Sequence, residues 1–232
     1  PASPSTTLTD NGADWSYGAG IRLGWIGQLT PTLTVGASVA SKVYMTEFDD
    51  YSNLFAEQGD FDIPANFAVG VTVKASPKVN LSFDFQRILY EGVNSISNAG
   101  PIPTGGGPFP NPPATGFLGA DNGLGFGWED INIYRIAAEY MPNARWTLRA
   151  GFALNDQPIG SDDVLFNILA PAVIEKHATV GFTFMPDKTS EWNFAYMHGF
   201  EEEVDTAVSA FGLPASIQMH QNSIDLSYSK RF

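Results

Sequence analysis

Four basic side chains that could bind an anionic group lie in segments where polar and apolar residues alternate. They are Arg22, Lys42, Arg135 and Arg149. Because successive side chains of a β-strand point to opposite faces, we expect these bases on the polar face of a sheet. That face would also carry Lys74, Asp84, Glu139 and Asp225. Two interpretations follow: ion pairs that stiffen the face, or a site for the carboxylate head group of a ligand.

Signals for catalysis or for a cofactor are weak. The three histidines, His177, His198 and His220, stand in different segments without Ser and Asp neighbours at a recognisable triad spacing. The absence of cysteine excludes disulfides and thiolate metal sites. The acidic runs at 49–62 and 201–205 lack the spacing of a calcium loop, so we interpret them as solvated surface. We expect no enzyme activity, no cofactor and no metal site.

Alternation of polar and apolar residues predicts nine strands. In the last segment, Ile224, Leu226, Tyr228 and Phe232 share one face, while serines and Asp225 share the other. Comparable segments are found throughout the sequence, at 15–25, 33–45, 66–74, 79–86, 134–140, 146–154, 177–184, 192–197 and 223–232. The first is about as long as a tilted membrane strand and has tryptophan at both ends. Short and long connections alternate strictly between these strands.

Composition favours a strand-built membrane protein. Charged residues make up 16% of the chain, against about 25% in soluble domains. No run approaches the roughly 20 apolar residues of a membrane helix. The polar face consists mostly of Gly, Ser, Thr and Asn, whereas a soluble β-sandwich, the alternative, would expose more Lys and Glu. We therefore predict an all-β, antiparallel transmembrane β-barrel in the outer membrane of a Gram-negative bacterium, in contact with lipid and lipopolysaccharide. The net charge of −13 argues against nucleic acid as a partner.

An odd number of strands cannot close into an antiparallel barrel. The unpaired edges would cost several kcal/mol for each exposed backbone group in lipid. We expect residues 1–232 to form one barrel domain, the C-terminal part of a longer protein whose first strands lie upstream.

The long connections contain more apolar residues than solvated loops need. One group is Tyr51, Leu54 and Phe55, and another includes Leu165 and Phe166. Further apolar loop residues are Phe109, Phe117, Leu118, Val164, Ile168, Leu169, Phe211 and Leu213. These side chains could pack the loops together over the barrel mouth, or form a greasy groove for a lipid-like ligand.

Several motifs resemble one family of membrane proteins. The stretches at 134–137, 146–153 and 155–158, with Tyr196-Met197-His198-Gly199, are similar to the outer-membrane long-chain fatty-acid and hydrocarbon transporters of the FadL/TodX (OMPP1) type. The resemblance implies a fourteen-stranded barrel with an N-terminal plug, of which this chain would hold the last nine strands. It also implies capture of hydrophobic ligands at extracellular loops, passage to a lumenal site and sideways exit, and it favours the group at Tyr51.

We therefore predict a passive, monomeric transporter for long-chain fatty acids or other hydrophobic compounds. Arg135, Arg149, Lys42 and Arg22 are the candidate head-group residues, and Tyr51, Leu54, Phe55, Leu165 and Phe166 are the candidate apolar contacts. The alternative is a general diffusion porin, or a barrel with a structural or adhesive role. Ion conductance separates the two, because a plugged transporter conducts little.

Overall fold

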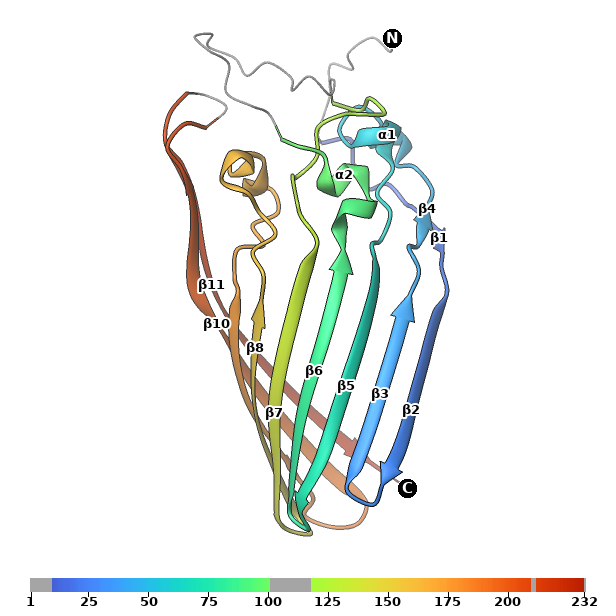
Figure 1. Cartoon of the computed structure of the whole chain (residues 1–232), viewed down its shortest axis with the longest axis vertical. Helices are drawn as coiled ribbons and strands as arrows, with labels where there is room; N and C mark the ends of the chain where they lie inside the picture. The colour runs from blue at the N-terminus through green and yellow to red at the C-terminus, as the bar shows by residue number, and fades with distance from the viewer. Residues whose placement is uncertain (1–9, 101–117, 210–211, 232) are drawn as a thin grey trace.

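A computed structural model describes residues 10–100, 118–209 and 212–231. Its main feature is a sheet of nine antiparallel strands in sequence order (Figure 1). The strands are β2 (Arg22–Thr30), β3 (Leu33–Ala40), β5 (Ala65–Ser76), β6 (Val79–Leu89), β7 (Ile131–Asn143), β8 (Trp146–Asn155), β9 (Lys176–Phe184), β10 (Ser190–Thr206) and β11 (Ala215–Lys230). The nine predicted strands and the all-β antiparallel fold are thus confirmed.

Long connections lie at one end of the sheet and short turns at the other (Figure 1). The long connections hold the small elements β4 (Tyr44–Met45), α1 (Ala56–Gly59) and α2 (Asn94–Ser97), with 3-10 turns at Asp49–Tyr51, Tyr90–Gly92, Ser161–Asp163 and Phe166–Ile168. The short strand β1 (Gly18–Ala19) lies before β2. We call segments 46–64, 90–100, 118–130 and 156–175 the loop layer. No helix in the described ranges is long and apolar enough to cross a membrane.

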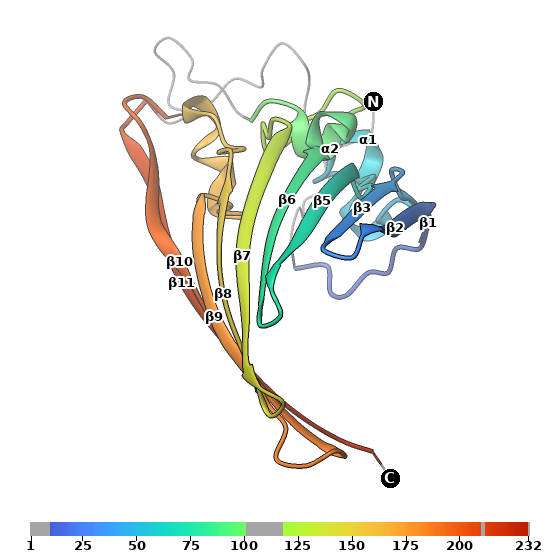
Figure 2. The same ribbon diagram turned by 60° about the horizontal axis from the view of Figure 1, so that its bottom comes forward.

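The sheet bends into a curved wall (Figure 2). Strands β2 and β11 form its two edges, and within the described residues they pair with β3 and β10 alone. We call the concave side of the wall the lumen face.

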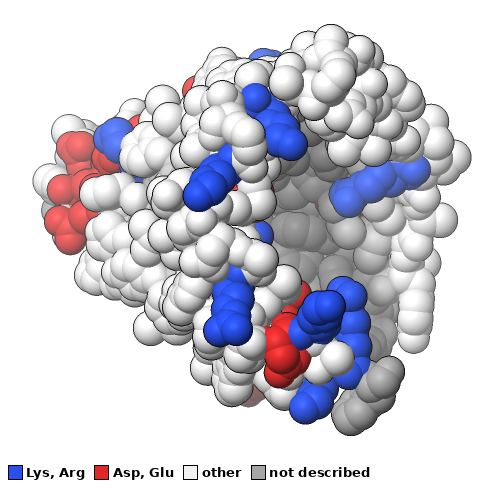
Figure 3. Space-filling model, turned by 90° about the horizontal axis from the view of Figure 1, so that it is seen from below, with Lys and Arg blue, Asp and Glu red and all other residues white. Residues whose placement is uncertain are grey.

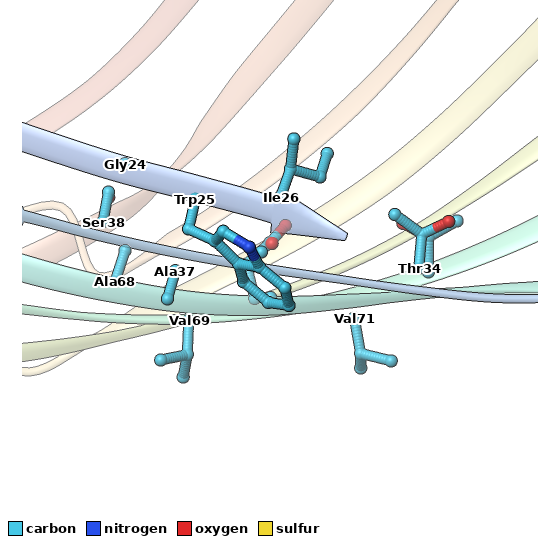
Figure 4. A pocket seen from close by; sticks show the side chains of 13 residues that line it. Gly24, Trp25, Ile26, Thr34, Ala37, Ser38, Ala68, Val69 and Val71 are labelled. Atoms are coloured by element: carbon cyan, nitrogen blue, oxygen red, sulfur yellow. The ribbon is translucent and has the colours of Figure 1, made fainter. Parts of the chain in front are cut away.

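The two faces of the wall differ as alternation predicts. On one face, Phe83 lies opposite Ile136, and Ile136 lies opposite Phe152. The apolar side chains of this face remain exposed. Ile136 is 58% exposed, and Leu226, on the apolar face of β11, is 68% exposed. On the other face small and polar residues follow one another, and Figure 4 shows Ile26 on the opposite side of the sheet from Trp25, Val69 and Val71. An exposed apolar face of this size is what a lipid-facing wall requires.

Most of the buried apolar side chains among the described residues lie in the loops, and only Ala40, Ile131 and Ile217 belong to strands of the wall. Ile159, Val164, Val173 and Ile217 form one cluster, which joins the loop layer to the protruding upper part of the β10–β11 hairpin. The described core is therefore between the loops, so the soluble sandwich, which needs a dry layer between two sheets, does not fit.

Several predicted strand limits are wrong. The predicted segment 33–45 ends as β3 at Ala40, with β4 in a separate two-stranded sheet, and the predicted last strand 223–232 begins already at Ala215. The segment 15–25 is not one strand: β1 pairs with β4, and β2 begins only at Arg22 and runs on to Thr30. Between β1 and β2, the Ile21 amide donates a hydrogen bond to Ser41 Oγ at 2.9 Å. The acidic run at 201–205 is not loop but the upper part of β10, opposite residues 216–219 of β11.

The register between β7 and β8 also differs from expectation. A tight turn at Pro142-Asn143 predicts Arg149 opposite Ala137, but Arg149 lies opposite Glu139. The strands reverse at residues 144–145 instead, where Asn143 Oδ1 accepts a hydrogen bond from the Arg145 amide at 2.9 Å. The ladder shifts between Tyr140 and Asn143. This shift brings a base and an acid face to face.

Candidate functional site

An apolar pocket of about 310 Å³ lies in the loop layer. We call it the loop pocket; its lining residues are Asp14, Phe48, Tyr51, Leu54, Phe55 and Phe61. Three of them, Tyr51, Leu54 and Phe55, are predicted ligand contacts, and the structure brings them together. Tyr51 is fixed by a hydrogen bond from its hydroxyl to the Gly12 carbonyl at 2.7 Å. Asp14 accepts bonds from the amides of Trp15 and Asp50.

The turn that follows the pocket residues has an unusual backbone. Glu57 and Gln58 have φ of 55° and 58°, and Gly59 has φ of 101°. Non-glycine residues adopt this left-handed region at a cost of about 1–3 kcal/mol, so neighbouring structure must hold them. The Glu57 and Gln58 amides donate to the carbonyls of Ala120 and Gly119 at 2.9 and 3.1 Å. Segment 118–121 therefore clamps the turn.

A charged cluster lies at the base of the same loop. Lys42, predicted to line the lumen, instead lies between β3 and β4 and forms an ion pair with Asp62. This hydrogen bond raises the pKa of Lys42. Burial would raise the pKa of Asp62, but bonds from Lys42 and the Met45 amide lower it. Burial and the nearby Asp62 and Glu57 charges raise the pKa of Asp60 to about 6.

This cluster predicts a pH effect on the pocket loop. Since the pKa of Asp60 is above its ordinary value, its protonated form favours the folded loop, and stability falls as pH rises from about 4 to 6. Asp62 does not offset this change, because its depressed pKa acts only at lower pH. Asp60→Asn should abolish the change and slow amide exchange at Phe48 about tenfold at pH 7. Hydrogen exchange at several pH values measures it. Equal pH profiles for both proteins would contradict the assignment.

Aromatic rings connect the loop pocket to the rest of the loop layer. The Phe55 and Phe61 ring centroids are 5.0 Å apart, and Phe61 lies 6.4 Å from Phe126. Phe126 in turn contacts Phe166 at 5.1 Å and Trp128 at 6.1 Å. The predicted ligand contact Phe166 is therefore part of the loop packing and does not line the pocket, nor does Leu165. Phe109, Phe117 and Phe211 lie outside the described residues.

Asn167 fixes the far end of this aromatic chain. It is fully buried, and its side chain accepts a bond from the Trp128 indole at 2.6 Å. It also donates to the carbonyls of Phe126 and Asp163. Because a buried amide without these partners would be costly, Asn167 ties loop 156–175 to segment 118–130.

Two shallow hollows lie on the lumen face of the wall. The first, about 460 Å³, spans β2, β3, β5 and β6 on a floor of small residues such as Gly24, Ser38 and Ala68 (Figure 4). Gly36 also lines it. The second, about 400 Å³, spans β6 to β11 and includes Arg135 and Arg149. Asp84 lines both.

Arg149 belongs to a network across five strands. Its Nε donates to Glu139 at 2.9 Å and its guanidinium to Thr183 at 2.8 Å. The chain of bonds continues from Asn80 on β6 through to Asn193 and Glu191 on β10. Arg149 thus follows the stiffening interpretation, while Arg135 donates to Gln86 at 3.0 Å and forms no ion pair among the described residues. Arg22 lies at the upper end of β2, likewise without an ion pair in that part of the chain.

Charge differs between the two ends of the wall. Most of the 25 Asp and Glu residues lie toward the long connections. The short-turn end carries Lys78, Arg145, Lys188, Lys230 and Arg231. Figure 3 shows Lys and Arg around the hollow seen from that end. A carboxylate ligand arriving at the loops would meet an unfavourable field, which salt screens beyond about 8 Å. The described residues hold no cluster of three or more potential metal ligands.

A model of the family described as Outer membrane protein transport protein (OMPP1/FadL/TodX) matches residues 1–232. The chain belongs to this family. Membership accounts for the lipid-facing wall and the polar lumen face described above. No curated protein matches the chain.

Solved structures of family members show the same fold. The deltaS2S3 mutant of the monoaromatic hydrocarbon channel TodX matches with a TM-score of 0.65 and 24% identity, covering 99% of this chain and 54% of that one. A Pseudomonas aeruginosa FadL homologue matches with a TM-score of 0.61 and 14% identity, covering 91% and 52%. The monoaromatic hydrocarbon channel CymD matches with a TM-score of 0.57 and 19% identity, covering 94% of this chain and 52% of that one. The chain spans about half the length of these structures.

Sequence reasoning missed three phenylalanines of the loop layer, Phe48, Phe61 and Phe126. Phe48 and Phe61 each stand beside an aspartate in the acidic run, which hides them in a composition-based interpretation. A sequence signal that could have identified Phe48 and Phe61 is their position, because they flank Tyr51, Leu54 and Phe55 on both sides. Phe126 is isolated in a Gly-rich stretch, and nothing local distinguishes it.

Proposed function

We propose that this chain forms part of a passive outer-membrane transporter for hydrophobic compounds, either long-chain fatty acids or uncharged aromatic hydrocarbons. The observation that carries the proposal is the loop pocket, an apolar space bounded by four aromatic side chains at the loop end of a barrel wall. Its volume of about 310 Å³ suits a single aromatic ring or a segment of an acyl chain. The TodX and CymD structures, described as monoaromatic hydrocarbon channels, support this ligand class.

The proposed route runs from the loop pocket to the lumen hollows. Small side chains on the floor of the first hollow leave room for an apolar ligand against the wall. Arg135 is the candidate contact for a carboxylate head group, because the guanidinium of Arg149 is already engaged by Glu139 and Thr183. We propose that transport proceeds by binding and release, without chemical change of the ligand.

We further propose a single barrel domain that crosses the outer membrane of a Gram-negative bacterium many times. The uncovered apolar face supports direct contact with lipid, and the loop end would meet lipopolysaccharide. We propose a monomer, in line with the prediction from the sequence.

Uptake and conductance together test the proposal. The product of the natural gene, expressed in a strain that lacks family members, should raise uptake of a labelled long-chain fatty acid or of a labelled aromatic hydrocarbon above the empty-vector rate. In planar bilayers it should show little steady ion current. A steady, ligand-independent current without hydrophobic uptake would favour the general diffusion porin instead.

A further inference from the structure

Three residues on neighbouring strands form a row across the lumen face. Gly70 on β5 lies directly opposite Asp84 on β6, and Asp84 lies directly opposite Arg135 on β7. Side chains of directly opposed residues have Cβ atoms about 4.5–5.5 Å apart, so Asp84 is within reach of the Arg135 guanidinium. An acid and a base in this arrangement would ordinarily form an ion pair.

The carboxylate of Asp84 turns the other way. It lies over Gly70, where a Cβ atom would overlap Asp84 Oδ1. Within the part of the chain that the structure describes, the Asp84 carboxylate makes neither a hydrogen bond nor an ion pair. The Arg135 guanidinium donates to Gln86 Oε1 at 3.0 Å and borders the second hollow. Since a guanidinium has five donors, most of them remain open to that hollow.

We propose that Gly70 is a positioning residue for ligand specificity: it accommodates the Asp84 carboxylate and so leaves Arg135 free to bind an anionic head group. The inference rests on the proposed function and specifies one ligand class within it, hydrophobic compounds that end in a carboxylate. A ligand carboxylate can form paired, charge-assisted bonds with the open edge of Arg135. If Asp84 instead paired with Arg135, it would compete with the ligand for the same donors.

The surroundings of Gly70 allow the proposal to be tested by adding one methyl group, in Gly70→Ala. Its backbone is extended, and alanine is compatible with that conformation. The atom that a Cβ would meet is the end of a flexible side chain, so Gly70→Ala displaces Asp84 rather than the strand. Gly36, opposite Gly70 on β3, offers a matched control: a Cβ there meets only the Trp25 carbonyl, at 3.6 Å.

The experiment measures the affinity of a long-chain fatty acid and of its methyl ester for the natural gene product in detergent. The variants are Gly70→Ala, Asp84→Asn, the double variant, and Gly36→Ala. Gly70→Ala should weaken binding of the acid about tenfold and leave binding of the ester unchanged. Asp84→Asn should bind the acid at least as tightly as the wild type. The double variant should match Asp84→Asn. Gly36→Ala also adds a methyl group to the lumen face but does not displace Asp84, so it should keep the wild-type ratio of acid to ester affinity.

Two results would overturn the inference: an acid-to-ester affinity ratio in Gly70→Ala equal to that of the wild type, or the same tenfold loss of acid binding when Gly70→Ala is made in the Asp84→Asn background. Should Gly70→Ala fail to fold, weaker acid binding by Asp84→Asn alone would overturn it. A wild-type protein that binds neither acid nor ester would instead contradict the proposed function, so the two failures are distinguishable.

Discussion

Replacing Phe126 by alanine is expected to loosen the whole loop layer while the wall stays folded. Phe126 is 7% exposed and its ring contacts Phe61, Trp128 and Phe166, which come from three different loops. Removing a buried phenylalanine ring costs about 3–5 kcal/mol. At 3 kcal/mol, amides that exchange by local opening of the loops should exchange roughly a hundredfold faster.

Hydrogen exchange of the Trp128 and Glu57 amides measures this effect, because each is bonded across loops, to Ile96 and Ala120. Strand amides should keep their protection, since the wall is held by its own ladder of backbone bonds. Phe200→Ala is the control: Phe200 is 40% exposed and lies near the upper end of β10. If the Glu57 amide is protected equally in Phe126→Ala and the wild type, the aromatic chain does not couple the loops.

How much of this arrangement the sequence predicts depends on the range of the interaction. Strand positions and the two faces follow from alternation, a property of adjacent residues. Alternation therefore places Arg135 and Asp84 on the same face. The register of Arg149 is wrong by two residues because the irregularity near Pro142 moves the turn to 144–145. Alternation along each strand does not determine at which of two adjacent positions the chain turns, and therefore does not determine the register of the strand pair.

Loop packing is beyond sequence patterns for a stronger reason. The contacts of Phe61 with Phe126, and of Phe126 with Phe166, join residues 65 and 40 positions apart. No periodicity links such residues, since each loop is irregular. Tyr51, Leu54 and Phe55 are predicted as apolar residues of one long connection, the group that the family resemblance favours, and the structure places them around one pocket. Phe166 is also an apolar loop residue, but it belongs to another loop and does not line the pocket.

Placing a charge in the loop pocket is expected to reduce hydrophobic uptake sharply. Leu54 lines the pocket, and its amide is bonded to the Tyr51 carbonyl at 2.9 Å, so its side chain can change without loss of that turn. Leu54→Asp removes apolar contact of about 1.5–3 kcal/mol and adds a carboxylate that must lose water when a ligand enters. Together these effects should weaken ligand capture by at least about tenfold.

Leu169→Asp supplies the matched control, since Leu169 belongs to another loop, is 70% exposed and does not line the pocket. It makes the same change in charge at the loop end, so a general electrostatic effect would appear in both variants. Uptake of a labelled aromatic hydrocarbon at low concentration measures capture without a charged head group. A loss confined to Leu54→Asp supports capture at the pocket. Equal uptake by Leu54→Asp and the wild type would mean that ligands reach the lumen by another route. A carboxylate buried beside a ligand in an apolar pocket always weakens binding of that ligand.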